Sequence, residues 1–255
     1  MEAHLGVLLI AFVASISCRL EKGNPQLRSI AADCFADCRD YRDRGHGNSS
    51  GIITTRSQDG ECSQESYCSM ETDGGGWTVF QRHQSDAVSF NRSWDDYKNG
   101  FGDLSDSFWW GNEKLAQALN DGRQYELRID LFDWERNHAY AKYSHFNVAP
   151  ESENYRVSFG GYSGTAGGDS FGWWQNRQKF STFDRDNDGD ASVNCGARYG
   201  GFWWRYCGFF LPNGRFSRTS DVPGWTGLHW RAWRGRESLR AVSMMFRADD
   251  WSITG

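Results

Sequence analysis

The stretch from Met70 to Arg82 reads METDGGGWTVFQR, and it places three consecutive glycines directly before an apolar and aromatic run. The run Trp77-Thr78-Val79-Phe80 is bounded by turn-forming residues, so it predicts a strand. A phosphate-binding glycine loop needs the N-terminus of a helix after it, and no helical pattern follows here. The stretch therefore indicates a turn that enters a strand of the core, with no nucleotide-binding loop.

Other short runs, separated by Gly, Asn, Asp and Ser, repeat this pattern along the chain, and they predict strands at residues 52–55, 125–131 and 141–143. Residues 125–131 alternate as a half-buried strand should. Helices are predicted at residues 94–99 and 112–120, where Asn112 is placed to cap the second helix and its apolar residues share one face. Because the C-terminal third is long, Gly-rich and irregular, we expect an α+β domain with functional loops.

The composition is unusual for a hydrophilic chain. The 255 residues include 13 Trp, 17 Phe and 10 Tyr but only 4 Pro, and the mean hydropathy is −0.71. Disordered chains are poor in aromatic residues, and collagen-like chains are rich in Pro, so both classes are excluded. A net charge of −5 gives no electrostatic reason to bind nucleic acid or an anionic membrane.

The N-terminal residues have the pattern of a secretion signal. Residues 5–17 (LGVLLIAFVASIS) are apolar and too short to span a bilayer comfortably. We therefore predict a signal peptide over residues 1–17 and a short linker over residues 18–33, with a buried N-terminal helix as the alternative. The mature protein is expected to be secreted and extracellular, with no membrane span.

Export would place the cysteines in an oxidising compartment, where disulfides form. Six cysteines make an even set, and their spacing alone leaves the pairing open: Cys34, Cys38, Cys62, Cys68, Cys195 and Cys207. Cys18 is the odd one, and it is either removed with the signal or kept as a thiol that joins two chains into a homo-oligomer. A zinc site is the competing use, but the spacings fit zinc ligands poorly.

Two triplets have the sequence of N-glycosylation sites. They begin at Asn48 and Asn91. On a secreted protein, each is a candidate to carry a glycan.

The densest chemical signal is the acidic run DRDNDGDAS at residues 184–192. Carboxylates at every second position repel one another unless water or a cation neutralises them, and hard oxygen ligands suit Ca²⁺. An EF-hand numbered from Asp184 fails because Cys195 stands where that motif needs a bidentate Glu. We therefore predict a calcium loop of another type, with a solvated, metal-free acidic turn as the alternative.

Catalytic motifs are weak in this chain. No H-E-x-x-H pair and no phosphate-binding glycine loop before a helix occurs. We therefore expect that the protein is not an enzyme.

Several ordered motifs resemble the fibrinogen-related domain, which is the C-terminal globular domain of fibrinogen. They are residues 70–82, 94–102 and 108–113, the acidic run with Cys195, Trp203-Trp204, and Asn213-Gly214. Within that family, the chain looks most like ficolins and tachylectin- or techylectin-type lectins. The resemblance implies a domain over residues 34–252, with a central, twisted, mainly antiparallel sheet, short helices, and a loop-rich, calcium-binding C-terminal part.

The resemblance also implies specific pairs and ligands. Cys34 would pair with Cys62, Cys38 with Cys68, and Cys195 with Cys207. The calcium ligands would be the side chains of Asp186 and Asp188 and the backbone carbonyls of Asp190 and Ser192.

In ficolin-like lectins, a pocket beside this loop recognises acetyl groups. The residues at that pocket are here Tyr199, Tyr206, Cys207, Gly208, Trp225 and Arg236. The family pattern implies a cis peptide bond between Tyr206 and Cys207. Gly208 replaces the usual His and Arg236 replaces a Tyr, which suggests an altered ligand such as an acidic sugar.

The resemblance therefore implies a secreted, calcium-dependent or calcium-stabilised lectin of innate immunity, which would bind acetylated or acidic glycans of microbial surfaces. A protein-binding module is the alternative, since related domains bind proteins. Seven tryptophans of the C-terminal third are expected to line the binding region: Trp173, Trp174, Trp203, Trp204, Trp225, Trp230 and Trp233.

Overall fold

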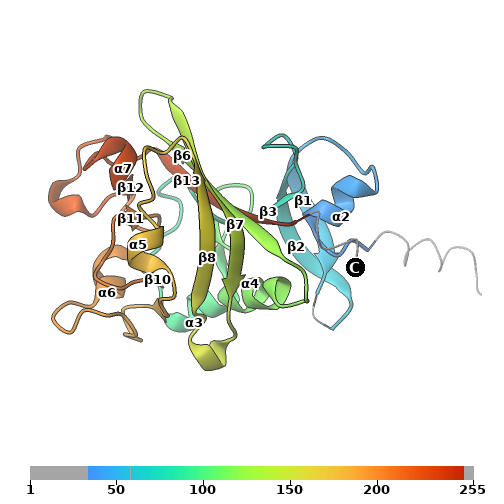
Figure 1. Cartoon of the computed structure of the whole chain (residues 1–255), viewed down its shortest axis with the longest axis horizontal. Helices are drawn as coiled ribbons and strands as arrows, with labels where there is room; N and C mark the ends of the chain where they lie inside the picture. Colours follow the sequence, from blue (N-terminus) through green and yellow to red (C-terminus); the bar gives the residue numbers. More distant parts are fainter. Residues whose placement is uncertain (1–33, 58, 250–255) are drawn as a thin grey trace, which may run out of the picture. The chain divides into compact units, whose positions relative to one another are not determined.

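The computed structural model describes residues 34–57 and 59–249 and is built around a nine-stranded sheet. The strand order is β1-β2-β3-β13-β6-β7-β8, and β5 pairs with β3 and with β4 (Figure 1). All of these strand pairs are antiparallel. The bounds are β1 Gly51–Arg56, β2 Cys62–Ser69, β3 Trp77–His83, β4 Phe101–Gly102, β5 Phe108–Trp109, β6 Tyr125–Phe132, β7 His138–Val148, β8 Val157–Gly164 and β13 Ala241–Ala248.

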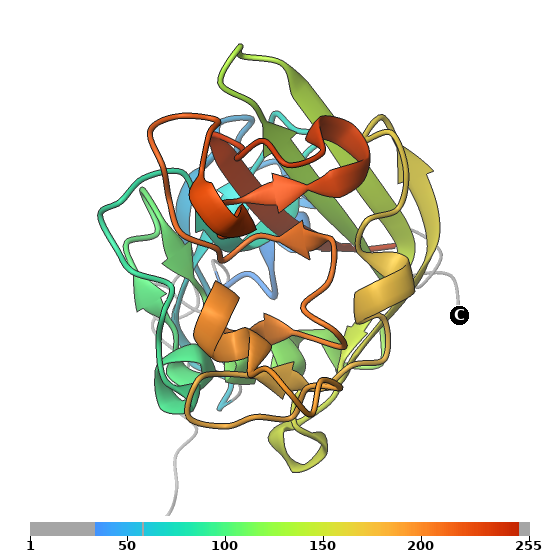
Figure 2. The same cartoon turned by 90° about the vertical axis from the view of Figure 1, so that its left-hand side faces the viewer.

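The remaining elements are short, and most of the late ones lie in a loop-rich segment between β8 and β13 (Figure 2). Two small sheets in this segment pair β9 with β10 and β11 with β12. The bounds are α2 Cys38–Asp43, α3 Trp94–Asn99, α4 Asn112–Leu119, η1 Glu151–Glu153, α5 Gly172–Gln175, β9 Phe180–Ser181, α6 Cys195–Tyr199, β10 Phe202–Trp203, β11 Phe210–Leu211, η2 Pro223–Trp225, β12 His229–Trp230 and α7 Arg231–Arg234. The predicted α+β class, with its mainly antiparallel sheet, is confirmed.

The triglycine stretch forms the turn between β2 and β3. Gly75 has a φ of +75°, and a Cβ there would lie 2.4 Å from the carbonyl oxygen of Met70, so only glycine fits. After this turn, β3 is almost entirely buried between β2 and β13. The predicted strand at 77–80 is therefore a central strand of the sheet.

Two side chains of β3 fix the loop-rich segment onto the sheet. Gln81 Nε2 donates to the carbonyl oxygen of Pro212 at 3.1 Å and to Asn213 Oδ1 at 3.1 Å. His83 Nδ1 lies 3.2 Å from the same Pro212 oxygen, and its ring stacks on Phe90. Because Gln81 and His83 are buried, these contacts replace water that the polar groups would otherwise need.

The helix at residues 94–99 begins and ends as predicted. Ser93 and Asp96 form a reciprocal capping box at its start. The second helix, α4, buries its predicted apolar face, but the expected cap is wrong: Gly111 is the N-cap, and Asn112 is the first helical residue. The Asn112 side chain instead accepts a hydrogen bond from Trp109 Nε1 at 3.0 Å.

The expected alternation of β6 is also wrong, because both faces of this strand are covered. Arg128 and Asp130, which were expected to face solvent, are only 6% and 5% exposed. The two side chains share one face of the strand and form an ion pair at 2.8 Å. Pairing allows two charges to be buried where neither would be buried alone.

Three disulfides join Cys34 to Cys62, Cys38 to Cys68, and Cys195 to Cys207. These are the pairs that the family resemblance implies. The predicted signal peptide, the linker, Cys18 and residues 250–252 lie outside the described residues. Within the described part of the chain, no helix has the length and apolar character needed to cross a bilayer.

Two buried histidines predict an acid-sensitive fold. Burial lowers the pKa of both His83 and His229 to about 4, against 6.5 for the free side chain. The unfolded chain therefore binds protons first on acidification, so the stabilising contribution is complete above about pH 6.5 and is lost as the pH falls toward 4. We expect urea unfolding to show a loss of roughly 2 kcal/mol per histidine between pH 8 and pH 5.

The double variant His83→Gln/His229→Gln isolates this effect from that of the carboxyl groups. It should be less stable than the wild type at pH 8 but should lose less further stability by pH 5. Equal pH slopes in the two proteins would show that these histidines do not carry the acid sensitivity.

Candidate functional site

The acidic loop at residues 184–192 connects β9 to the segment that leads into α6. At its start, Asp184 Oδ1 accepts hydrogen bonds from the backbone N–H of Trp94 at 2.9 Å and from Thr182 Oγ1 at 2.7 Å. Asn187 holds the loop to β9 through Phe180 and Ser181. The loop is therefore fixed at its start to α3 and β9.

The next three carboxylates organise the loop backbone. Asp186 Oδ1 accepts from the N–H of Asp188 at 3.2 Å, and Asp188 Oδ1 accepts from the N–H of Asp190 at 2.7 Å. Asp188 Oδ2 accepts from the N–H of Cys195 at 2.8 Å. Burial raises the pKa of the Asp188 carboxyl, and the neighbouring charge of Asp186 raises it further.

This donor set has the chemistry of a site for a hard cation. Asp186 and Asp188 offer only oxygen atoms, and neither forms an ion pair with an Arg or Lys among the described residues. The same part of the chain contains no group of three or more His, Cys, Asp or Glu side chains placed to hold a metal ion. The carboxylate oxygens of Asp186 and Asp188 are of the hard type that Ca²⁺ prefers.

The loop also supports the turn at the disulfide. The N–H of Gly189 donates to the carbonyl oxygen of Arg205 at 2.8 Å, and a Cβ on Gly189 would lie 2.7 Å from that oxygen. The disulfide between Cys195 and Cys207 adds a covalent link two residues later. Residues 205–207 are thus held by the acidic loop from two directions.

The expected cis peptide bond before Cys207 is wrong. Every peptide bond among the described residues is trans, and the chain turns through positive φ values of 51° at Cys207 and 57° at Gly208. A Cβ at Gly208 would approach the Gln175 amide at 3.0 Å. The turn therefore comes from left-handed backbone at two consecutive residues.

The residues expected to form one pocket are divided. Tyr199 lies beside Trp204 and lines a cavity of about 490 Å³ together with His83, Phe90 and Phe216. That lining includes none of Tyr206, Trp225 and Arg236. Tyr199 therefore lines a cavity whose wall does not include the other aromatic and cationic residues of the expected set.

Two of these residues instead belong to a surface on which arginines stack against aromatic rings. The Arg236 guanidinium lies 3.8 Å from the centroid of the Trp225 ring. Arg231 lies 5.5 Å from the same ring and 4.4 Å from that of Phe209. These contacts bring η2, α7 and the turn after Cys207 together.

The contacts continue from Phe209 toward the disulfide turn. The Trp174 ring of α5 meets the Phe209 and Tyr206 rings edge to face, at centroid distances of 5.0 Å and 6.2 Å. Arg205 lies 5.5 Å from the Tyr206 ring. The aromatic–arginine surface consists of Trp174, Arg205, Tyr206, Phe209, Trp225, Arg231 and Arg236.

The charge of this surface is uncompensated. Arg205, Arg231 and Arg236 are exposed and form no ion pair with any carboxylate that the structure describes. Arg234 differs, since it binds Asp133. Beside Trp174, Trp173 is 77% exposed. The surface therefore presents three positively charged side chains that pack on aromatic rings.

Sequence reasoning missed Arg205, Phe209 and Arg231 because no motif marks them. Their contacts depend on how three separate loops pack. The expectation that seven tryptophans line the site is wrong for Trp203, Trp204 and Trp230, which are fully buried in the core. Both predicted glycosylation residues, Asn48 and Asn91, are exposed.

A sequence profile of the family "Fibrinogen beta and gamma chains, C-terminal globular domain" matches residues 34–249. Angiopoietin-4 of Bos taurus is 38% identical over 231 residues, which are 90% of this chain and 46% of that protein. The chain thus spans about half the length of that relative.

Two solved structures share the fold. The fibrinogen-like globe domain of human ANGPTL6 has a TM-score of 0.78 at 36% identity, covering 84% of this chain and 95% of that chain. Lamprey fibrin D-dimer, complexed with the peptide ligand Gly-His-Arg-Pro-amide, has a TM-score of 0.73 at 32% identity, covering 90% and 78%.

These relatives overturn the lectin interpretation. They are angiopoietins and angiopoietin-related proteins, so the nearer likeness to ficolins and tachylectin-type lectins is not supported. The wider family resemblance is confirmed: over residues 34–249, this chain belongs to the family of the C-terminal globular domain of the fibrinogen beta and gamma chains.

Proposed function

We propose that the chain is a secreted, non-enzymatic protein-binding module whose aromatic–arginine surface binds an acidic segment of a partner protein. The observation that carries this proposal is the set of three exposed arginines, Arg205, Arg231 and Arg236, that stack on aromatic rings without ion pairs. A partner carboxylate would supply the missing counter-charge.

The composition of the surface suits protein recognition. Trp, Tyr and Arg are the residue types that most often dominate binding energy at protein interfaces. A guanidinium is weakly hydrated, and its planar fork matches a carboxylate with two parallel hydrogen bonds. Stacking on Trp225 or Phe209 restricts the arginines before a partner arrives, which lowers the entropy cost of binding.

The relatives support the same class of function. One of them, the lamprey fibrin D-dimer, is complexed with a peptide ligand. The three disulfides support secretion, because such bonds persist in oxidising compartments.

We further propose that Ca²⁺ bound by Asp186 and Asp188 stabilises the surface. The acidic loop contacts Arg205 through Gly189, and it reaches Cys207 through Cys195. A divalent cation would neutralise two neighbouring carboxylates and so would hold the turn that carries Arg205 and Tyr206.

Charge reversal tests the surface. The chain would be used to select binders from a displayed peptide library, and we expect the selected peptides to be rich in Asp and Glu. Arg231→Glu and Arg236→Glu should each weaken the dissociation constant of a selected peptide about tenfold or more, measured by interferometry.

Arg156→Glu is the matched control, because Arg156 is exposed, lies outside the surface, and undergoes the same change of charge. Its affinity should equal that of the wild type. Peptides without acidic residues, or full binding by the Arg231→Glu and Arg236→Glu variants, would reject the proposed surface.

Calcium removal tests the loop separately. With free Ca²⁺ about 100-fold above its dissociation constant, a bound ion adds about 3 kcal/mol, which corresponds to a rise in Tm of roughly 5–10 °C relative to the protein in EDTA. Asp186→Asn and Asp188→Asn should abolish that rise in a calorimetric scan.

Asp103→Asn serves as the control. Asp103 is exposed, and it accepts hydrogen bonds from Ser105 in a turn far along the chain from the acidic loop. Its variant should keep the calcium-dependent rise. A wild-type Tm that is the same in Ca²⁺ and in EDTA would show that the loop does not bind Ca²⁺.

A further inference from the structure

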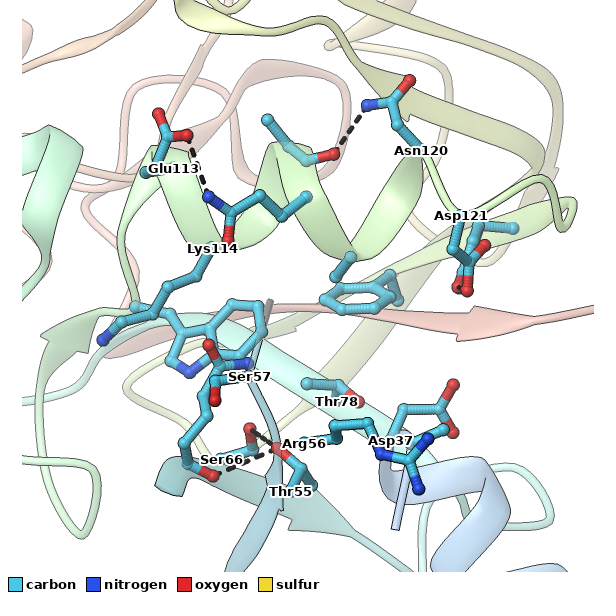
Figure 3. A pocket seen from close by; sticks show the side chains of 18 of the residues that line it. Asp37, Thr55, Arg56, Ser57, Ser66, Thr78, Glu113, Lys114, Asn120 and Asp121 are labelled. Carbon is cyan, nitrogen blue, oxygen red and sulfur yellow. Dashed lines mark hydrogen bonds between the residues drawn. The ribbon is translucent and has the colours of Figure 1, made fainter. Parts of the chain in front are cut away.

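A cavity of about 560 Å³ lies between α4 and the strands β1 and β2 (Figure 3). None of the residues that line it belongs to the aromatic–arginine surface or to the acidic loop. Small-molecule sites in proteins have volumes of roughly 300–1,000 Å³, so the cavity has the size of such a site.

Three aromatic side chains, Trp110, Tyr125 and Phe246, contribute to the walls. Their polar atoms are already engaged. Trp110 Nε1 donates to the carbonyl oxygen of Glu65 at 3.0 Å, and the Tyr125 hydroxyl donates to Asp121 Oδ2 at 2.8 Å. The rings are therefore fixed in place, and what they offer an occupant is apolar surface.

Every carboxylate in the lining has an ion-pair or hydrogen-bond partner within the protein. Asp37 and Asp121 both pair with Arg123, at 2.6 Å and 2.7 Å. Glu113 accepts hydrogen bonds from Gln117 Nε2 at 2.9 Å and from the Tyr155 hydroxyl at 2.7 Å. A cationic occupant would have to break one of these contacts.

Lys114, unlike these carboxylates, has no oppositely charged partner among the described residues. It is half-buried on α4, and no carboxylate of the described residues lies within ion-pair distance of its ammonium group. Burial lowers the pKa of Lys114, and Glu65 opposes this only through its charge at longer range. Figure 3 shows Lys114 at one end of the cavity and Asp37 and Asp121 at the other.

The cavity also offers a neutral polar group. Thr78 is buried on β3, and its hydroxyl has no hydrogen-bond partner among the residues that the structure describes. The hydroxyls of Thr55 and Ser66 differ, because they bond to each other at 3.0 Å. Thr78 can therefore donate to an occupant without losing an existing bond.

We propose that this cavity binds a small aromatic carboxylate, whose ring packs against Trp110, Tyr125 and Phe246 and whose anionic group pairs with Lys114. The apolar wall of the cavity would contact the ring of such a molecule, and the unpaired ammonium group of Lys114 would contact its carboxylate. Bringing a carboxylate to a half-desolvated ammonium restores the pairing that the protein itself does not supply.

The experiment titrates the full chain with three naphthalene probes of matched size: 1-naphthylacetate, the neutral 2-(1-naphthyl)ethanol, and the cationic 2-(1-naphthyl)ethylamine. Isothermal titration calorimetry should give a dissociation constant of about 1 mM or below for 1-naphthylacetate. The alcohol should bind about tenfold more weakly, and the amine should show no saturable binding.

Variants then locate the site. Lys114→Glu should weaken 1-naphthylacetate binding at least about tenfold, whereas Lys114→Arg should retain it. Lys179→Glu, with the same change of charge outside the cavity, should leave the affinity unchanged, as should Arg231→Glu on the aromatic–arginine surface. Ala118→Trp, which fills the cavity from α4 without a change of charge, should abolish binding.

Unchanged far-UV circular dichroism and Tm would show that each variant is folded, and Lys114→Glu alone decides the question if Ala118→Trp does not fold. Equal affinity for the three probes, full binding by Lys114→Glu, or the absence of saturable binding of 1-naphthylacetate would each overturn the proposal. The acidic-peptide assay with Arg231→Glu measures the aromatic–arginine surface separately, so failure of this site is distinguished from failure of that surface.

Discussion

The insertion of β13 between β3 and β6 is the constraint on which the rest of the structure depends. Met244 pairs with Gln81 of β3 on one side and with Ile129 of β6 on the other. β13 is the last strand of the described chain. The central strand of the sheet therefore follows, in sequence, the whole loop-rich segment between β8 and β13. The sheet holds both ends of that segment, and the hydrogen bonds of Gln81 and His83 to the carbonyl oxygen of Pro212 hold its middle.

This arrangement explains how a segment with few regular elements holds a binding surface. The hydrogen bonds of Asp188 and Gly189, together with the disulfide between Cys195 and Cys207, hold the turn from Arg205 to Cys207. Packing of aromatic rings on that turn then positions Trp174 and Phe209. The surface is rigid because buried polar contacts and a covalent bond replace secondary structure. Phe246 of β13 also lines the cavity beside α4, so the strand that closes the sheet forms part of the wall of that cavity.

Much of the sheet could be predicted from the sequence, because local pattern determines it. Residues 77–80 form a strand after a turn that only glycine allows, and the helix predicted at 94–99 has those bounds in the structure. The errors had tertiary causes. Asn112 does not cap its helix because Trp109 uses its side chain, and β6 does not alternate because Arg128 and Asp130 neutralise each other in the interior.

The site was predicted less well for the same reason. The acidic loop was identified from four carboxylates in one run, and Trp225 and Arg236 from a family pattern. The contact between Arg231 and Phe209 joins residues of different loops, and no periodicity records it. The likeness to lectins failed because the motifs that carried it belong to the wider family, which also includes the angiopoietins that this chain resembles.

The central claim is that a partner protein binds on the aromatic–arginine surface, and hydrogen–deuterium exchange of the chain with a selected acidic peptide tests it most directly. The account predicts slowed exchange in three separate segments, residues 172–175, 205–210 and 223–236, and unchanged exchange in α4. Protection confined to the cavity beside α4, or to the sheet strands, would contradict the account even if the peptide binds tightly.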